Sequence, residues 1–512
     1  MPRIKNLVAI IACLAVVGGV SVPVSASVDQ VGDDLVGEAL LDEFGDAMAM
    51  SADGTRVAIG AVPDDASAFG YVRVFEWDSN TATWNQLGDD IDGEAEGDEF
   101  GRSIAMSADG NRVAIGARYD DGNGTDSGHV RVFDWDSNTA TWNQAGDDID
   151  GEAEGDQSGE SLAMSADGNR IAIGATYNDG TDAILFYRSG HVRVFDWDSD
   201  TATWNQAGDD IDGEAGLDRS GESVAMSADG NRIAIGAQYN DGNGSDSGHA
   251  RVFDWDSNTA TWNQAGSDID GEAEGDESGH SIAMSADGNR IVIGSEDHDD
   301  LCGGGLDSGH ARIFDWDSNT ATWNQVGENI GGKAAEDDFG WSVAMSADGT
   351  RIAIGAIQYG TESPASGYVS VFDVMEVSVA SQEASTLIVQ LGGDINGEAP
   401  DDHSGHSVVM SADGTRIAIG ADENGGNGTD SGHVRIFDWD SNTATWNQAG
   451  DDIDGEAAGD LSGHSLAISA DGNRIAIGAR YNEGDNGNSS ATGHVRIFDW
   501  DSNTATWNQA GD

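Results

Sequence analysis

The stretch Ser165-Ala-Asp-Gly-Asn-Arg-Ile-Ala-Ile-Gly174 decides the fold of this chain. Its Asp-Gly and Gly-Asn steps favour the left-handed backbone of a tight turn. Apolar residues flank the turn on both sides, in residues 161–164 and 170–174. The stretch therefore predicts a β-hairpin.

This hairpin is repeated along the whole chain. Ser-Ala-Asp-Gly occurs eight times, with starts 56 to 65 residues apart, at Ser51, Ser107, Ser165, Ser227, Ser285, Ser346, Ser411 and Ser469. A period of this length indicates stacked copies of one unit. A unit of about 60 residues is too small to bury a good core alone, so it must share its apolar faces with its neighbours.

Each repeat reads as four short strands. In the repeat from 159 to 208 they are expected at 161–164, 170–174, 191–195 and 203–206, and no helical periodicity is present. We therefore predict an all-β fold, a β-propeller of four-stranded antiparallel blades. Eight blades are favoured and seven blades with a spare repeat are the alternative. A linear solenoid is less well supported, because neither end resembles a polar capping repeat.

Tryptophan pairs support this unit. Seven repeats carry one Trp on the third strand and one on the fourth, as in Trp197 and Trp204, which predicts packing across the outer hairpin. Repeat six lacks the pair, and its outer hairpin is expected to be longer.

The two ends suggest how the array closes. Gln30-Val-Gly-Asp-Asp34 matches the Gln-Ala-Gly-Asp-Asp that follows the fourth strand elsewhere, and the chain stops at Asp512 in the same phase. The leading stub could add an outer strand to the last blade and lock the ring. Trp507 and its neighbours compete for that place.

Residues 1–26 read as a signal peptide. Arg3 and Lys5 precede an apolar run of 14 residues, 7–20, and residues 24–26 form a small-residue cleavage site. The run is shorter than the roughly 20 residues of a membrane span. We expect residues 27–512 to form a single propeller domain that is secreted or held at the cell surface. An uncleaved anchor is the alternative.

The charge balance restricts the partners. The formal net charge is −70, which repels nucleic acid and anionic membranes and attracts cations or basic proteins. No cofactor motif is recognised, and we expect a monomer.

Self-repulsion at this charge should weaken the compact state at low ionic strength. The thermal midpoint is therefore expected to rise with NaCl concentration. A midpoint that does not respond to salt would contradict this.

The sequence resembles FG-GAP repeats, as in the integrin α-subunit propeller. Phe44-Gly45, Phe100-Gly101 and Phe339-Gly340 stand where that motif places Phe-Gly, and Gly60-Ala61 where it places Gly-Ala. The resemblance implies a propeller that serves extracellular recognition or adhesion. Five repeats depart from it with Ser-Gly, at Ser158, Ser220, Ser278, Ser404 and Ser462.

The calcium loop of that family lies between strands one and two, and here it is only a tight Ser-Ala-Asp-Gly turn. One carboxylate cannot supply the six to eight oxygens that calcium takes, so those sites do not carry over. Weak calcium binding is possible instead in the acidic connectors, such as Asp90, Asp92, Glu94 and Asp98. The alternative is a solvated linker between blades.

One position varies while its surroundings repeat. The residue after the Gly that precedes strand one is, in order, Asp46, Arg102, Glu160, Glu222, His280, Trp341, His406 and His464. If strand one is innermost, these side chains ring one mouth of the central channel and form a candidate ligand-binding rim. The histidines and glutamates could hold a metal or a small anion there. A second set of histidines, such as His191, begins strand three and is expected to be structural.

No catalytic motif stands out in the sequence. We therefore favour a secreted, non-enzymatic recognition or adhesion scaffold whose ligand is an extracellular protein or glycan. The first alternative is an extracellular polysaccharide hydrolase or lyase that uses the His and carboxylate ring. The second is an acidic surface protein that collects cations.

Overall fold

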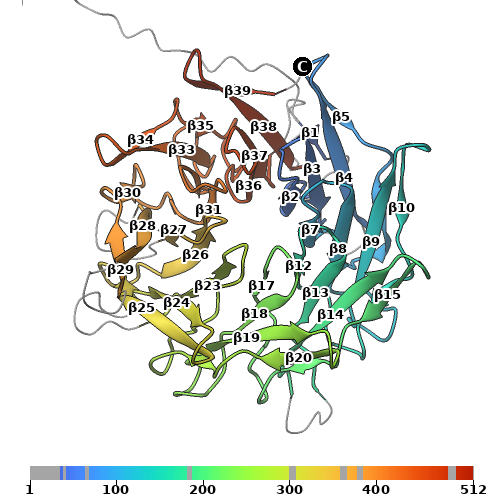
Figure 1. Cartoon of the computed structure of the whole chain (residues 1–512). Coiled ribbons are helices and arrows are strands. Elements are labelled where there is room, and N and C mark those ends of the chain that lie inside the picture. The colour runs from blue at the N-terminus through green and yellow to red at the C-terminus, as the bar shows by residue number, and fades with distance from the viewer. Residues whose placement is uncertain are drawn as a thin grey trace, which may run out of the picture.

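The computed structural model describes residues 35–37, 42–63, 69–180, 187–298, 307–357, 366–377, 385–482 and 492–510. Within these ranges the chain forms strands and no helix, and the strands make eight antiparallel sheets in a closed circle (Figure 1). The eight-bladed propeller is confirmed, and the seven-bladed and solenoid alternatives are wrong. In the described ranges no helix has the length and apolar character to span a bilayer. The expected signal peptide lies outside them.

The blades follow one another along the chain, each with its first strand at the centre (Figure 1). Blade 1 contains β2 (Met48–Met50), β3 (Arg56–Ala61), β4 (Phe69–Asp78), β5 (Thr83–Gln86) and β6 (Ile91–Glu96). Blade 2 contains β7 (Ser103–Met106), β8 (Arg112–Ala117), β9 (His129–Asp136), β10 (Thr141–Gln144) and β11 (Ile149–Asp150). Blade 3 contains β12 (Ser161–Met164), β13 (Arg170–Ala175), β14 (His191–Asp198), β15 (Thr203–Gln206) and β16 (Ile211–Asp212). Blade 4 contains β17 (Val224–Met226), β18 (Arg232–Ala237), β19 (His249–Asp256), β20 (Thr261–Gln264) and β21 (Ile269–Asp270).

The second half repeats this order. Blade 5 contains β22 (Ile282–Met284), β23 (Arg290–Ser295), β24 (His310–Asp317) and β25 (Thr322–Gly331). Blade 6 contains β26 (Phe339–Met345), β27 (Arg351–Ala356), β28 (Tyr368–Val377), β29 (Ser385–Gln390) and β30 (Ile395–Asn396). Blade 7 contains β31 (Ser407–Met410), β32 (Arg416–Ala421), β33 (His433–Asp440), β34 (Thr445–Gln448) and β35 (Ile453–Asp454). Blade 8 contains β36 (Leu466–Ile468), β37 (Arg474–Ala479), β38 (His494–Asp501), β39 (Thr506–Gln509) and β1 (Leu35–Val36).

The repeated turn forms as predicted. In blade 3 the Asp167 carboxylate accepts hydrogen bonds from the Ser165 hydroxyl and the Asn169 backbone amide, at 2.7 and 3.0 Å. The Asp167 carboxylate thus stabilises the turn itself. On the outer hairpin Trp197 and Trp204 lie directly opposite, with ring centroids 5.4 Å apart.

The core lies between consecutive blades. Val130 and Val132 of β9 pack against Ile171 and Ile173 of β13, and all four side chains are buried. Both faces of the middle strands are covered in this way, so these strands are apolar on both sides. Burial of such side chains against the next blade supplies the main stabilisation of the ring.

Two rings of hydrogen bonds run around the whole propeller. The Ala of each Ser-Ala-Asp-Gly turn donates its backbone N–H to the same Ala of the next blade, from Ala52 to Ala108 and finally from Ala470 back to Ala52. The arginine that opens each second strand donates to a backbone carbonyl of the next blade, as Arg112 does to Gly168 at 2.9 Å. Arg474 closes this second ring on Gly54 at 2.9 Å.

The leading stub closes the ring without competing with Trp507. β1 pairs with the N-terminal end of β38, with Leu35 opposite Val495, while β39 pairs with its C-terminal end, with Trp500 opposite Trp507. In six of the other blades a short strand after the fourth, such as β16, fills the place of β1. In blade 5 the end of β25 fills it. The two ends of the chain therefore complete one blade together.

The junction of blades 5 and 6 departs from the pattern. β25 runs on as a single ten-residue strand, and the β28–β29 hairpin is longer than its counterparts, as predicted for repeat six. Val374 and Ile388 face each other where the other hairpins carry the Trp pair.

Candidate functional site

The eight variable residues predicted to form a rim lie at the start of the innermost strands, which surround the central opening (Figure 1). A turn sets their direction. The residue three positions earlier has a left-handed backbone in every blade, and in blade 5 the Glu277 carbonyl accepts a hydrogen bond from the backbone amide of His280. Residues other than glycine have a conformational cost in the left-handed region. We call these eight residues the first ring.

Six members of the first ring touch in sequence. Arg102 donates to Asp46 at 2.8 Å, and Nε2 of His464 lies 3.6 Å from Asp46. The rings of His464 and His406 have centroids 4.9 Å apart. Trp341 continues the series, 6.0 Å from His406 and 5.1 Å from His280. Residues from blades 2, 1, 8, 7, 6 and 5 thus form one continuous surface.

A second ring interleaves with the first. The residue after the Ile-Gly-Ala of strand two is variable. In four blades it contacts the first-ring residue of the next blade. Arg118 donates to Glu160, Gln238 contacts His280, Asp422 contacts His464 and Arg480 donates to Asp46, at 2.9 to 3.1 Å. Sequence reasoning missed this ring, although its variation between constant neighbours was a visible signal. We call both rings together the collar.

Carboxyl groups with raised pKa values gather in and beside the collar on the side of blades 4 to 6. Burial, with nearby Asp297 and Glu277, raises the pKa of Glu296 to about 9. Burial and Asp297 also raise the pKa of Glu277 to about 7 and that of Asp338 to about 7. Glu296 lies 3.1 Å from Nδ1 of His280, whose pKa burial lowers to about 4. Carboxyl groups that keep their protons near neutral pH can donate hydrogen bonds or act as acids.

Glu222 lies apart from this contact series. Burial raises its pKa, Arg219 opposes the rise and Glu160 adds to it. One of its carboxylate oxygens is buried without a hydrogen-bond partner.

The carboxylates predicted as a calcium loop turn to different partners. Asp90 forms a two-pronged ion pair with Arg73 at 2.8 and 3.0 Å. Asp92 is exposed on β6. Glu94 lies 3.5 Å from Arg131. Asp98 accepts the backbone amide of Ala95, and burial beside Asp120 raises its pKa to about 6.

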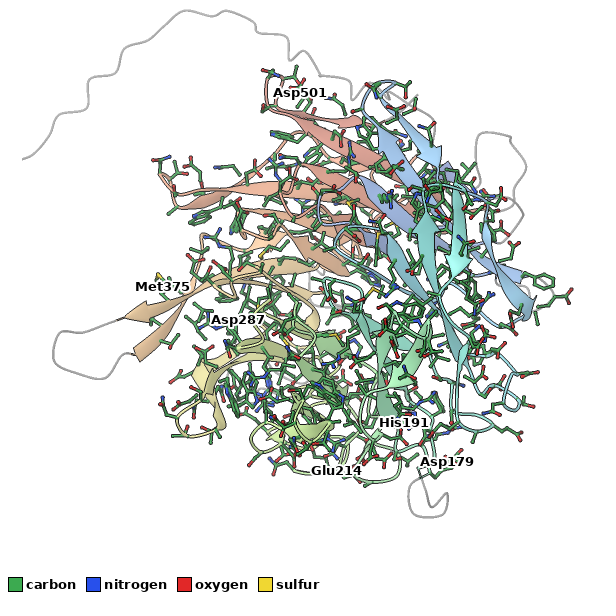
Figure 2. All side chains as sticks on the ribbon, turned by 45° about the vertical axis from the view of Figure 1, so that its right-hand side comes forward. Asp179, His191, Glu214, Asp287, Met375 and Asp501 are labelled. Atoms are coloured by element: carbon green, nitrogen blue, oxygen red, sulfur yellow. The ribbon has the colours of Figure 1, made fainter. Side chains whose placement is uncertain are left out.

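The strand-three histidines do not meet one another, but each lies beside carboxylates. His191 is buried with both ring nitrogens unbonded, and burial lowers its pKa to about 3 (Figure 2). It shares a cluster with Glu152 and Asp210, and similar clusters form around His129, His310 and His433.

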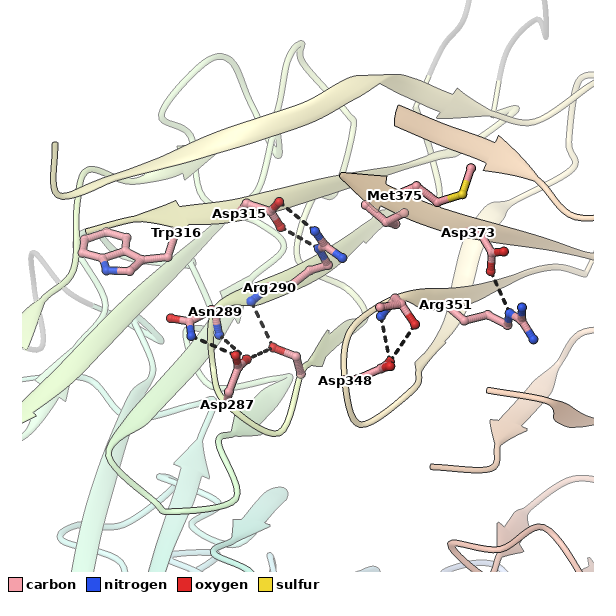
Figure 3. Close-up of a pocket in the computed structure, with 12 residues that line it drawn as sticks. Asp287, Asn289, Arg290, Asp315, Trp316, Asp348, Arg351, Asp373 and Met375 are labelled. Carbon is pink, nitrogen blue, oxygen red and sulfur yellow. Dashed lines mark hydrogen bonds and ion pairs between the residues drawn. The ribbon is translucent and has the colours of Figure 1, made fainter. Parts of the chain in front are cut away.

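A groove of about 700 Å³ opens at the junction of blades 5 and 6 (Figure 3). Asp287, Arg290 and Trp316 line it from blade 5, and Asp348 and Met375 from blade 6. Met375 is 43% exposed on the long hairpin (Figure 2). Sequence reasoning noted the lost Trp pair here but not the groove.

The groove exists because an arginine lacks its aromatic cover. In six blades the strand-two arginine stacks over the Trp pair of the next blade, 4.5 to 5.6 Å from the ring centroids, as Arg232 does over Trp316 and Trp323. Arg290 keeps its ion pair with Asp315 and its bond to the Gly349 carbonyl. Opposite it blade 6 offers Val374 in place of an indole.

The repeat unit matches a known family model. Residues 91–133, 210–253 and 331–372 match the FG-GAP repeat, and each segment runs from a connector through the first three strands of blades 2, 4 and 6. The chain contains FG-GAP repeats. A comparison with curated proteins finds no match.

Solved structures share the fold at low sequence identity. Sqt1 of Saccharomyces cerevisiae is 11% identical, with a TM-score of 0.51, over 94% of this chain and 97% of that one. A putative 6-phosphogluconolactonase from Bacteroides uniformis is 13% identical, with a TM-score of 0.46, over 78% of this chain and 97% of that one. The periplasmic gluconolactonase of Pseudomonas aeruginosa is 14% identical, with a TM-score of 0.42, over 83% and 96%. Similarity at this level describes the fold alone.

Proposed function

We propose that this FG-GAP propeller is a secreted, non-enzymatic recognition scaffold, and that the groove between blades 5 and 6 takes its ligand. The observation that carries the proposal is the groove itself, at the one repeat that has lost its Trp pair. In the other repeats the Trp pair occupies the equivalent position and packs between blades.

The groove is suited to an aromatic side chain of a protein partner. At six of the equivalent junctions an indole pair covers the arginine, so a planar ring from outside would find the same partner in Arg290. Exposed Met375 on the hairpin adds apolar contact. The lining carries more aspartates than arginines, and the chain as a whole is strongly acidic. A partner with basic residues around its aromatic side chain is therefore favoured.

Restoring the Trp pair should close the groove. Val374 and Ile388 stand opposite each other, as the paired tryptophans do, and Ile388 lies over Gly327 as the indoles lie over the equivalent glycines. We expect Val374→Trp with Ile388→Trp to abolish ligand binding while raising the free energy of unfolding by about 1–2 kcal/mol. Denaturant titration measures the stability change.

Binding is measured by calorimetry with two synthetic probes, the peptide Lys-Lys-Trp-Lys-Lys and its Ala counterpart. The parent chain should bind the Trp peptide about 10-fold more tightly, and the double-Trp variant should show no preference. Val374→Leu with Ile388→Leu is the matched control that leaves the groove open. A preference that survives in the double-Trp variant would place recognition elsewhere. Tighter binding of cellohexaose than of the Trp peptide would replace the protein partner with a glycan.

A polysaccharide hydrolase or lyase acting at the collar is the second candidate. It is favoured by Glu296, which keeps its proton near neutral pH beside His280 and so resembles a general acid. This candidate would be supported if the parent chain releases reducing ends from acidic polysaccharides and Glu296→Gln does not. Equal release by the parent chain and by Glu296→Gln would contradict the hydrolase or lyase hypothesis.

A further inference from the structure

The collar brings two histidines and one buried aspartate together between blades 7 and 8. His406 and His464 open neighbouring inner strands, and Asp422 follows the second strand of blade 7. Nδ1 of His464 lies 3.1 Å from Oδ2 of Asp422, and Nδ1 of His406 lies 3.7 Å from the same oxygen. The candidate ligand atoms all fall within 4.8 Å of one another.

These separations match the edges of a tetrahedral site. Zinc binds imidazole nitrogen and carboxylate oxygen at about 2.0–2.2 Å, so two of its ligands stand about 3.3–3.5 Å apart. The observed separations of 3.1 and 3.7 Å lie on either side of that value.

Two of these side chains carry unused polar atoms. Oδ1 of Asp422 and Nδ1 of His406 are buried and have no hydrogen-bond partner, and the Asp422 side chain is only 7% exposed. A buried carboxylate oxygen without a partner is costly, and an ion is one of the few groups that satisfies it. Burial alone would raise the pKa of Asp422, but the facing histidines hold it below its usual value. Burial lowers the pKa of His406 below its usual value, and imidazole coordinates a metal in its neutral form.

We infer that His406, Asp422 and His464 bind one divalent transition metal ion of the zinc class. The fourth position is left for water or for a ligand at the collar. Asp46 faces the other ring nitrogen of His464 at 3.6 Å and would orient that ring. Imidazole ligands favour zinc over calcium, which takes oxygen alone.

The other His and carboxylate clusters are weaker candidates, because a cation already serves their carboxylates. Arg131 lies 3.5 Å from Glu94 beside His129, and Arg435 lies 3.8 Å from Glu398 beside His433. Arg193 acts in the same way on Glu152 and Asp210, and Arg312 on Glu272 beside His310. In the collar the nearest such arginine, Arg480, is paired with Asp46 instead, at 3.1 Å.

The test titrates the full chain with ZnCl2 in excess CaCl2, which occupies weak carboxylate sites. Calorimetry should show one tight zinc site. Asp422→Asn and His464→Gln should each weaken it by about 100-fold or more. His280→Gln is the matched control, because this third first-ring histidine contacts Gln238 and Glu296 instead.

A second readout is the visible absorption of bound Co²⁺, which is strong for a tetrahedral site. It should appear in the parent chain and in His280→Gln and vanish in the two site variants. Thermal unfolding without metal shows that the variants fold. Absence of a tight zinc site in the parent chain, or a tight site that persists in both site variants, would overturn the inference. The groove between blades 5 and 6 is tested without zinc, so the two proposals fail separately.

Discussion

Glu296→Gln is expected to make the stability of this protein much less sensitive to pH. Glu296 is 8% exposed and its pKa in the folded chain is about 9, against 4.5 for an ordinary glutamate. Between these values the folded chain holds a proton that the unfolded chain has released. The contribution of Glu296 to stability is therefore present at acid pH and is lost as pH rises toward 9. Glutamine has no proton to lose.

Between pH 5 and 9 the free energy of unfolding should fall by roughly 2–4 kcal/mol more in the parent chain than in Glu296→Gln. This figure is discounted for coupling to neighbouring carboxyl groups. Thermal or denaturant unfolding at several pH values between 5 and 9 measures it. Some slope will remain in the variant, because the pKa values of Glu277 and Asp338 are also raised, to about 7. Glu154→Gln, at an exposed position, is the control and should leave the pH profile unchanged. Parallel profiles for parent and Glu296→Gln would show that Glu296 is charged in the folded chain.

A disulfide across the seam of the ring should give the largest gain in stability. Leu35 of β1 stands opposite Val495 of β38 in an antiparallel pair, and such pairs have Cα separations of about 4.5–5.5 Å, within the range of disulfides. Leu35→Cys with Val495→Cys, in a background in which Cys13 and Cys302 are replaced by serine, would close a loop that spans almost the whole propeller. Chain-entropy estimates for loops this long give about 5–6 kcal/mol. Denaturant titration of the oxidised and reduced forms measures the gain.

The matched control moves one cysteine out of register. In Val36→Cys with Val495→Cys the two thiols are not directly opposite, because residue 36 pairs with His494. It should cross-link poorly and gain little. Equal gains for both pairs would mean that β1 is not held in one register against β38.

The repeated unit could be predicted from the sequence because its signals are local. The Asp-Gly turn fixes the inner hairpin, and the paired tryptophans fix the outer one. The role of the leading stub stayed open, because the sequence does not tell where along β38 each partner pairs. In the structure they pair with different parts of β38, β1 with its N-terminal end and β39 with its C-terminal end.

The candidate sites were harder to predict because they arise between blades. The first ring could be predicted because its residues stand at one fixed position before the first strand of each repeat. The second ring depends on contacts such as Asp422 with His464, which join residues 42 positions apart in neighbouring blades. The groove likewise depends on Arg290 in one blade and Val374 in the next. A single repeat contains only half of each contact.

The closed eight-bladed ring is tested most directly by the mass and mobility of the Leu35→Cys, Val495→Cys protein after mild oxidation. A closed ring predicts a disulfide within each folded molecule, formed at low protein concentration and found between residues 35 and 495 by peptide mapping. Free thiols in the folded protein, or a disulfide formed only between molecules, would mean that the first and last segments do not share a blade.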